Sequence, residues 1–258
     1  MTIRILMKFN HLLAFVVVSS LVFSCQTKKP EESQDPWAFE IKKIEQKTCA
    51  GKECVSVDIS YPVFGDKKLQ SLIERIIVQG MSFEGQPETL SLDSAVQGFM
   101  GEYIALKKEF PDAISWEYSM EVRVSYQSDS LLSLAFDSFS FTGGAHPNSF
   151  RSYLNFDKNT GQGITNSELI LEERTLLSKA EVEFRKYHAV GEDMNLKDDG
   201  RFFLNERDEF FLPAAIGFEL DSLVLYYNSY EIGPYVMGPT ELKLPLSELA
   251  GIVAFTNK

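Results

Sequence analysis

The residues best suited to chemistry lie in one short segment, residues 141–148, which read Phe-Thr-Gly-Gly-Ala-His-Pro-Asn. Gly143 and Gly144 permit a positive φ or a close approach of another backbone. Pro147 fixes its own φ and disfavours helical geometry at His146. His146 is therefore presented in a constrained, non-helical loop, where it could act as a general base, contact a ligand or anchor the loop through backbone hydrogen bonds.

Catalysis by a histidine needs a partner that the sequence does not supply. A general base activates a positioned nucleophile, and no Gly-x-Ser-x-Gly motif is present. The other histidine outside the N-terminal apolar segment, His188, falls near the end of a predicted helix, and two isolated histidines do not form a zinc site. Residues 195–206 half match a calcium loop, but Lys197 stands where an anionic ligand belongs, which favours a solvated turn. We expect no catalytic residue, no metal and no cofactor.

Four tyrosines near the C-terminus could form an aromatic platform for a sugar or a protein, because tyrosine is rigid and amphipathic. Tyr226 and Tyr227 belong to a predicted strand, in which alternate side chains face the core. Tyr230, Glu231 and Tyr235 belong to a segment interrupted by glycine and proline, and we expect these three to be exposed.

The N-terminus is typical of an exported lipoprotein. Residues 1–24 combine a basic start with an apolar run that is short for a membrane span, which predicts a lipoprotein signal peptide. Leu-Val-Phe-Ser-Cys at residues 21–25 looks like a lipobox, so Cys25 is the expected lipidation site; an ordinary signal peptide is the alternative. Residues 25–36 are polar and read as a flexible tether. We expect a membrane-anchored, extracytoplasmic protein, periplasmic or on the cell surface. Gln26 favours the outer membrane in a two-membrane cell.

Charge and cysteine content narrow the functional classes further. The formal net charge is −12, and it becomes −14 once Arg4 and Lys8 are removed with the signal peptide. An acidic surface argues against nucleic acid and suits a basic protein partner. Cys49 and Cys54 flank Gly51, and an oxidising compartment favours a disulfide between them.

Hydrophobic periodicity predicts an α+β fold built from antiparallel sheets, with helices packed on one face and two intimately associated subdomains. Strands are expected at 41–47, 55–61, 115–127, 131–141, 149–156, 210–213, 224–227 and 242–246, and helices from Asp66 to Gly80, from Ser91 to Pro111 and over 171–189. Pro62 is expected to end the second strand. We place an N-terminal domain at 37–147, ending in the Thr-Gly-Gly-Ala-His-Pro-Asn loop, and a C-terminal domain at 148–258.

Residues 142–148 resemble the signature of a family of bacterial envelope domains. That family includes the ectodomains of lysozyme-sensing anti-sigma factors (RsiV-like) and the non-catalytic accessory region of peptidoglycan deacetylases (PdaC-like). Residues 225–235, Leu-Tyr-Tyr-Asn-Ser-Tyr-Glu-Ile-Gly-Pro-Tyr, resemble the segment that commonly ends its second domain, with Gly233 where alanine is common. Neither the deacetylase barrel nor an anti-sigma segment has a counterpart here, so the resemblance implies binding rather than catalysis or signalling.

These observations predict a lipid-anchored, non-enzymatic envelope protein that recognises a lysozyme-like hydrolase or a peptidoglycan-type glycan and contacts the membrane through its lipid only. The alternative is an envelope hydrolase or deacetylase-type enzyme that acts on glycan through His146. The residues expected to bind the ligand are Gly143, Gly144, His146, Asn148, Tyr230, Glu231 and Tyr235.

Overall fold

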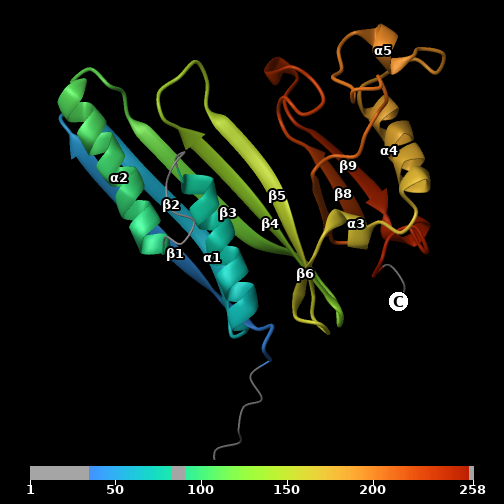
Figure 1. Cartoon of the computed structure of the whole chain (residues 1–258), viewed down its shortest axis with the longest axis horizontal. Coiled ribbons are helices and arrows are strands. Elements are labelled where there is room, and N and C mark those ends of the chain that lie inside the picture. Colours follow the sequence, from blue (N-terminus) through green and yellow to red (C-terminus); the bar gives the residue numbers. More distant parts are fainter. Residues whose placement is uncertain (1–34, 83–90, 256–258) are drawn as a thin grey trace, which may run out of the picture. The chain divides into compact units, whose positions relative to one another are not determined.

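We describe the protein from a computed structural model, which describes residues 35–82 and 91–255. The predicted signal peptide, Cys25 and nearly all of the tether lie outside the described residues. Two sheets and their helices are shown in Figure 1. In chain order the elements are β1 (Phe39–Ala50), β2 (Glu53–Phe64), α1 (Lys67–Met81), α2 (Leu92–Glu109), β3 (Trp116–Gln127), β4 (Leu131–Phe141), β5 (Asn148–Asp157), β6 (Gln162–Ile164), α3 (Asn166–Leu169), α4 (Glu173–Tyr187), α5 (Leu196–Asp199), β7 (Ala215–Glu219), β8 (Ser222–Tyr227), η1 (Tyr235–Met237), β9 (Thr240–Pro245) and η2 (Leu246–Glu248).

The predicted α+β class is confirmed. One sheet has the order β1-β2-β3-β4-β5-β6 and the other β7-β8-β9. Every neighbouring pair is antiparallel except β2 and β3, which are parallel because α1 and α2 carry the chain back between them. No helix in the described residues is long and apolar enough to cross a membrane.

The first hairpin forms as predicted and carries the expected disulfide. Cys49 and Cys54 are opposite one another at the end of the β1–β2 pair and are bonded. Gly51, in the turn between them, has φ 75°, a left-handed conformation that glycine adopts without steric cost. The strand β2 continues through Pro62 to Phe64, contrary to prediction. Pairing with β3 ends at Ser60, so Pro62 lies where that side of β2 has no strand partner.

The helices α1 and α2 begin at the predicted caps. Leu69 donates its backbone N–H to the Asp66 carboxylate at 2.8 Å, and Ser94 donates to the Ser91 hydroxyl at 3.2 Å. α1 passes through the predicted end at Gly80 and ends one residue later, at Met81. Gly80 must be small, because a Cβ there would lie 2.6 Å from the hydroxyl of Tyr118. Both helices bury their apolar stripes against one face of the six-stranded sheet (Figure 1).

The second core lies among α4, the three-stranded sheet and the segments that join them. The predicted strand at 210–213 does not form; Phe210 instead packs in irregular backbone against Phe184 of α4, with ring centroids 5.0 Å apart. The strand was predicted from the apolar side chains of this segment, but irregular backbone buries such side chains as well as a strand does.

The two sheets meet through a buried polar network. Asn155 of β5 donates to the carbonyl of Ile216 at 2.8 Å and accepts from the Ser133 hydroxyl at 2.8 Å. The hydroxyl of Ser133 accepts in turn from the backbone N–H of Phe218 at 3.1 Å. Both side chains are almost completely buried. Side chains of β4 and β5 thus form hydrogen bonds with backbone groups of β7, the edge strand of the smaller sheet.

A second, charged layer borders that network. Tyr153 lies against Gly217, where a Cβ would come within 2.0 Å of its ring, and donates its hydroxyl to Glu219 at 2.9 Å. Burial alone would raise the pKa of Glu219, but hydrogen bonds from Arg123 and Tyr153 hold that pKa below its ordinary value.

Since β5 pairs with β4, the predicted boundary between residues 147 and 148 falls between hydrogen-bonded neighbours of one sheet.

Candidate functional site

The loop between β4 and β5 turns at its first glycine. Gly143 has φ 84°, and a Cβ there would lie 3.6 Å from the side chain of Ile114. Gly144 does not share the positive φ, and among the described residues other than its chain neighbours no heavy atom lies within 4 Å of the Cβ it would carry. Only the first glycine is therefore required by the backbone, while the second leaves the tip of the loop small and exposed.

His146 stands exposed in this loop and is held by three groups. Its ring stacks on Tyr235, with centroids 3.9 Å apart and planes 18° apart. Its Nδ1 lies 3.0 Å from the carbonyl oxygen of Pro147, which can only accept a hydrogen bond, so Nδ1 carries the proton. In the neutral ring Nε2 is then an acceptor, and it lies 3.3 Å from the hydroxyl of Tyr230.

Tyr235 completes the arrangement by donating its hydroxyl to the same Pro147 carbonyl at 3.1 Å. We call His146, Tyr230 and Tyr235 the aromatic cluster. The chain brings together residues more than eighty positions apart, and three of the predicted ligand-binding residues meet at one surface.

A second loop, between β8 and η1, is fixed on β5 by side chains that mimic a strand partner. Asn228 accepts from the backbone N–H of Arg151 at 2.7 Å and donates to its carbonyl at 3.0 Å. The carboxylate of Glu231 accepts from the backbone N–H groups of Asn228 and Ala214, both at 2.8 Å. Glu231 therefore supports the loop, and its carboxylate oxygens are engaged by the protein's own backbone. Contrary to expectation, Glu231 and Tyr235 are only partly exposed.

Tyr230 is held by this support in a conformation that is uncommon for a residue with a side chain. Its φ is 70°, in the left-handed region, and its side chain is 56% exposed. Backbone strain of this kind costs about 1–3 kcal/mol and persists only where the surroundings over-determine it. Val236, beside Tyr235, is 91% exposed. The cluster is thus a rigid aromatic surface with an apolar rim.

The other predicted residues fall at or beyond the margins of the cluster. Asn148 is the first residue of β5 and is exposed, paired with Ser140 of β4. Tyr227 is buried, with its hydroxyl donated to the carbonyl of Phe211 at 2.6 Å. His188 caps α4 and lies 2.9 Å from the hydroxyl of Thr240, and burial lowers its pKa, with a further contribution from Arg201.

Within residues 35–82 and 91–255, no group of three or more histidine, cysteine, aspartate or glutamate side chains could hold a metal ion. In the half-matched calcium loop, Asp199 pairs with Arg201, and Lys197 pairs at 2.6 Å with Asp208, just beyond the loop.

Sequence reasoning missed Asn228 and Val236. Nothing in the spacing of Asn228 indicates that its amide pairs with a strand seventy-seven residues earlier. Val236 follows a proline and a tyrosine in a segment whose exposure is set by the short η1 turn. The one indication in the sequence that these two residues matter was the tyrosine-rich segment around them.

Comparison with known proteins agrees with this architecture. Residues 48–149 match the family model described as deacetylase PdaC, and residues 168–247 match the model of a protein family of unknown function, DUF3298. No curated protein matches the chain.

Two solved structures share the fold. A DUF3298 family protein from Pseudomonas aeruginosa PAO1 has a TM-score of 0.63 and 22% identity, over 85% of this chain and 96% of that one. A DUF3298 family member from Bacteroides fragilis NCTC 9343 has a TM-score of 0.63 and 19% identity, over 85% and 95% of the two chains. Together the two family models span the β4–β5 loop and the tyrosine segment that form the aromatic cluster, and the chain thus consists of a PdaC-type domain followed by a DUF3298 domain.

Proposed function

We propose that this protein is a non-enzymatic binding protein of the cell envelope that presents the aromatic cluster to a basic, lysozyme-like hydrolase. The observation that carries the proposal is the stacking of His146 on Tyr235 beside the exposed Tyr230. Aromatic side chains fixed before binding lose little entropy on association, and such residues dominate the energy of protein interfaces. Val236 supplies apolar contact at the rim.

Electrostatics favour a basic partner. The formal charge of −12 becomes −14 without the signal peptide, and opposite fields speed the encounter of two proteins. A lipid on Cys25 would hold the chain at the membrane surface, where a wall-degrading enzyme arrives from outside. Localisation at the envelope and the lysozyme-like partner are both parts of this proposal.

Calorimetry of the mature chain with a lysozyme tests it directly. Tyr230→Ala and His146→Ala are each expected to weaken binding about tenfold or more, the loss typical of a central interface residue. Tyr187→Ala is the matched control, because Tyr187 on α4 is also a tyrosine with 56% of its surface exposed, yet lies outside the cluster. Raising the salt concentration should slow association.

Absence of binding at high micromolar concentration, or equal affinity in Tyr230→Ala and the unaltered protein, contradicts the proposal. The deacetylase name of one family model makes an enzyme the alternative. That alternative predicts turnover of a glycan that is lost in His146→Ala while the fold survives. It requires Nε2 of His146 as a base, although the hydroxyl of Tyr230 lies within hydrogen-bond distance of that atom.

A further inference from the structure

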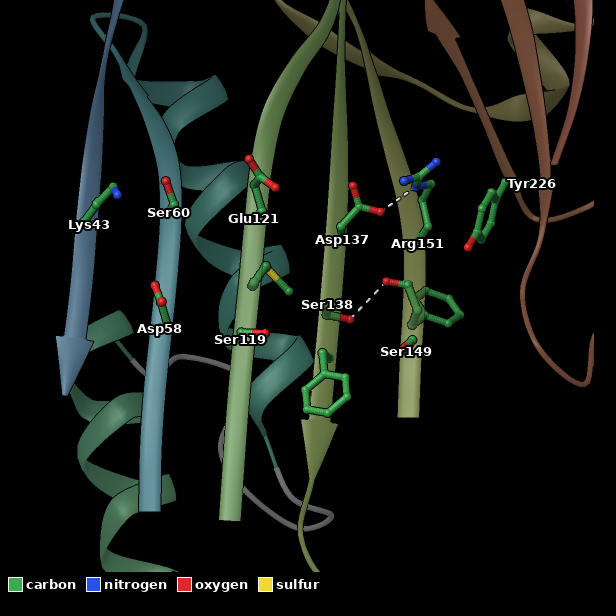
Figure 2. A pocket seen from close by; sticks show the side chains of 13 residues that line it. Lys43, Asp58, Ser60, Ser119, Glu121, Asp137, Ser138, Ser149, Arg151 and Tyr226 are labelled. Carbon is green, nitrogen blue, oxygen red and sulfur yellow. Dashed lines mark hydrogen bonds and ion pairs between the residues drawn. The ribbon is translucent and has the colours of Figure 1, made fainter. Parts of the chain in front are cut away.

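A groove of about 680 Å³ lies on the six-stranded sheet, on the face turned away from α1 and α2. One end of this face is covered by β7, and the other end is open. Figure 2 shows the open end, with polar side chains rising from β1 to β5 and Tyr226 of β8 at one side. None of the residues of the aromatic cluster lines this groove.

Strand register aligns the lining into a row that crosses the sheet. The following residues are opposite one another, each with its neighbour on the next strand: Lys43, Ser60, Glu121, Asp137 and Arg151. The same row is visible in Figure 2. Adjacent strands are about 4.8 Å apart, so the row is about 19 Å long. A ligand that follows it must be elongated and must make regularly spaced polar contacts.

Among the charged side chains that line the groove, three carboxylates (Asp58, Glu121 and Asp137) face two cations (Lys43 and Arg151). Asp137 is neutralised by Arg151, which also pairs with Glu241 at 2.8 Å. Glu121 is directly opposite Asp137, whose charge is already balanced by Arg151 and, at 3.6 Å, by Arg123. Among the described residues neither Glu121 nor Asp58 has an ion-pair partner, and both are exposed. A ligand with positive charge or hydrogen-bond donors would supply the partners that these two carboxylates lack.

The rest of the lining supplies hydroxyls and aromatic faces. Ser60, Ser119 and Ser149 lie on the same side of the sheet, and each hydroxyl can both donate and accept. Phe139 lies between Ser119 and Ser149 in the register. Tyr226 forms the side wall, with the guanidinium of Arg151 over its ring at 4.6 Å. Alternating hydroxyls, carboxylates and aromatic faces match the two sides of a sugar ring, one edged with hydroxyls and the other with C–H groups.

A peptide is less well suited to this surface. Extended peptides gain affinity from main-chain hydrogen bonds at a sheet edge. Here the backbone groups of β2, β3 and β4 are already paired within the sheet, and its face offers side chains alone. Anionic ligands are disfavoured by Asp58 and Glu121.

We propose that the open-face groove binds an oligosaccharide that carries amino groups, laid across the strands from Lys43 to Tyr226. Carboxylates of Asp58 and Glu121 receive the ammonium and hydroxyl groups, the serines pair with ring hydroxyls, and Phe139 and Tyr226 contact the apolar faces. The site goes beyond the proposed function, because it uses residues outside the aromatic cluster and does not depend on the hydrolase.

Calorimetry of the mature chain with four probes tests this assignment: a glucosamine tetramer, an N-acetylglucosamine tetramer, a galacturonic acid tetramer and tetralysine. The glucosamine tetramer should bind most tightly, the acetylated one more weakly, and the galacturonic acid tetramer not at all. The double variant Asp58→Asn/Glu121→Gln should weaken the first interaction about tenfold or more. Glu117→Gln is the matched control, because Glu117 is exposed on the same face of β3 but lies outside the groove.

The assignment is overturned if the galacturonic acid tetramer binds as well as the glucosamine tetramer, if tetralysine binds more tightly than either glucosamine probe, or if the double variant keeps full affinity. Tyr230→Ala should leave glucosamine binding unchanged, and Asp58→Asn/Glu121→Gln should leave binding through the aromatic cluster in place. Failure of one site is therefore distinguishable from failure of the other.

Discussion

Replacing Asn155 with leucine should weaken the contact between the two sheets and lower the free energy of unfolding. The side chain is 2% exposed and serves both Ile216 of β7 and Ser133 of β4. Leucine has the same branching and the same number of side-chain heavy atoms but no polar atom, so the Ile216 carbonyl loses its donor and the Ser133 hydroxyl loses its acceptor. Each buried polar group left unsatisfied costs about 1–3 kcal/mol, so we expect a loss of about 2–6 kcal/mol.

Urea unfolding measures this loss, and two signals report on different parts of the chain. The two tryptophans, Trp37 and Trp116, both pack with the core of the six-stranded sheet, so their fluorescence follows that sheet. Far-UV circular dichroism follows both sheets. Residues 35–258 form one compact unit, and the two signals should coincide in the unaltered protein.

In Asn155→Leu the midpoint should fall, and the dichroism should begin to change before the fluorescence as the smaller sheet loosens first. Asn159→Leu makes the same chemical change in an exposed turn and should stay within about 0.5 kcal/mol of the unaltered protein. A loss below about 1 kcal/mol in Asn155→Leu would mean that the network does not hold the sheets together, and the account of their interface would be wrong.

Other substitutions test separate features of the fold. Gly217→Ala places a Cβ 2.0 Å from the ring of Tyr153, so an overpacking cost of about 1–3 kcal/mol is expected in urea melts, and a neutral result would show that the ring moves freely. Removing the disulfide with Cys49→Ala/Cys54→Ala should cost about 2 kcal/mol by the chain-entropy relation, measured against the oxidised protein. The pKa of His188 lies below its ordinary 6.5, so as the pH falls below 6.5 the unfolded chain binds a proton that the folded one does not, and stability should fall. His188→Gln should flatten stability against pH in that window; an unchanged slope would assign the acid sensitivity to other groups.

Local chemistry made the hairpins, caps and disulfide predictable. Asp66 and Ser91 are helix caps because their side chains accept backbone N–H groups three residues later, and this interaction needs no distant partner. The alternation of apolar and polar residues in β2 likewise predicted which face of that strand is buried. The predicted end at Pro62 was wrong because a distant neighbour decided it, since β3 stops pairing before the proline, while α1 ends at Met81, one residue beyond the predicted Gly80.

The site was predictable in composition and not in geometry. His146, Tyr230 and Tyr235 stood out by type and by their loops, but their stacking depends on Asn228 and Glu231, which position the second loop through long-range contacts. The groove left no signal in the sequence at all. Its row arises from the register of five strands, and each member taken alone is an ordinary outward-facing polar residue.

Both surfaces are built on the same strand, β5, and this decides which variants can probe them. The side chain of Arg151 lies in the groove, while its backbone N–H and carbonyl hold Asn228 and, through it, the loop of Tyr230. A substitution at Arg151 would remove the counter-ion of Asp137 and disturb the wall formed by Tyr226, and the strain could pass to the aromatic cluster through the same residue. Glu121 and Tyr230 are at the far ends of this connection, so substitutions there change one surface and leave the shared support intact.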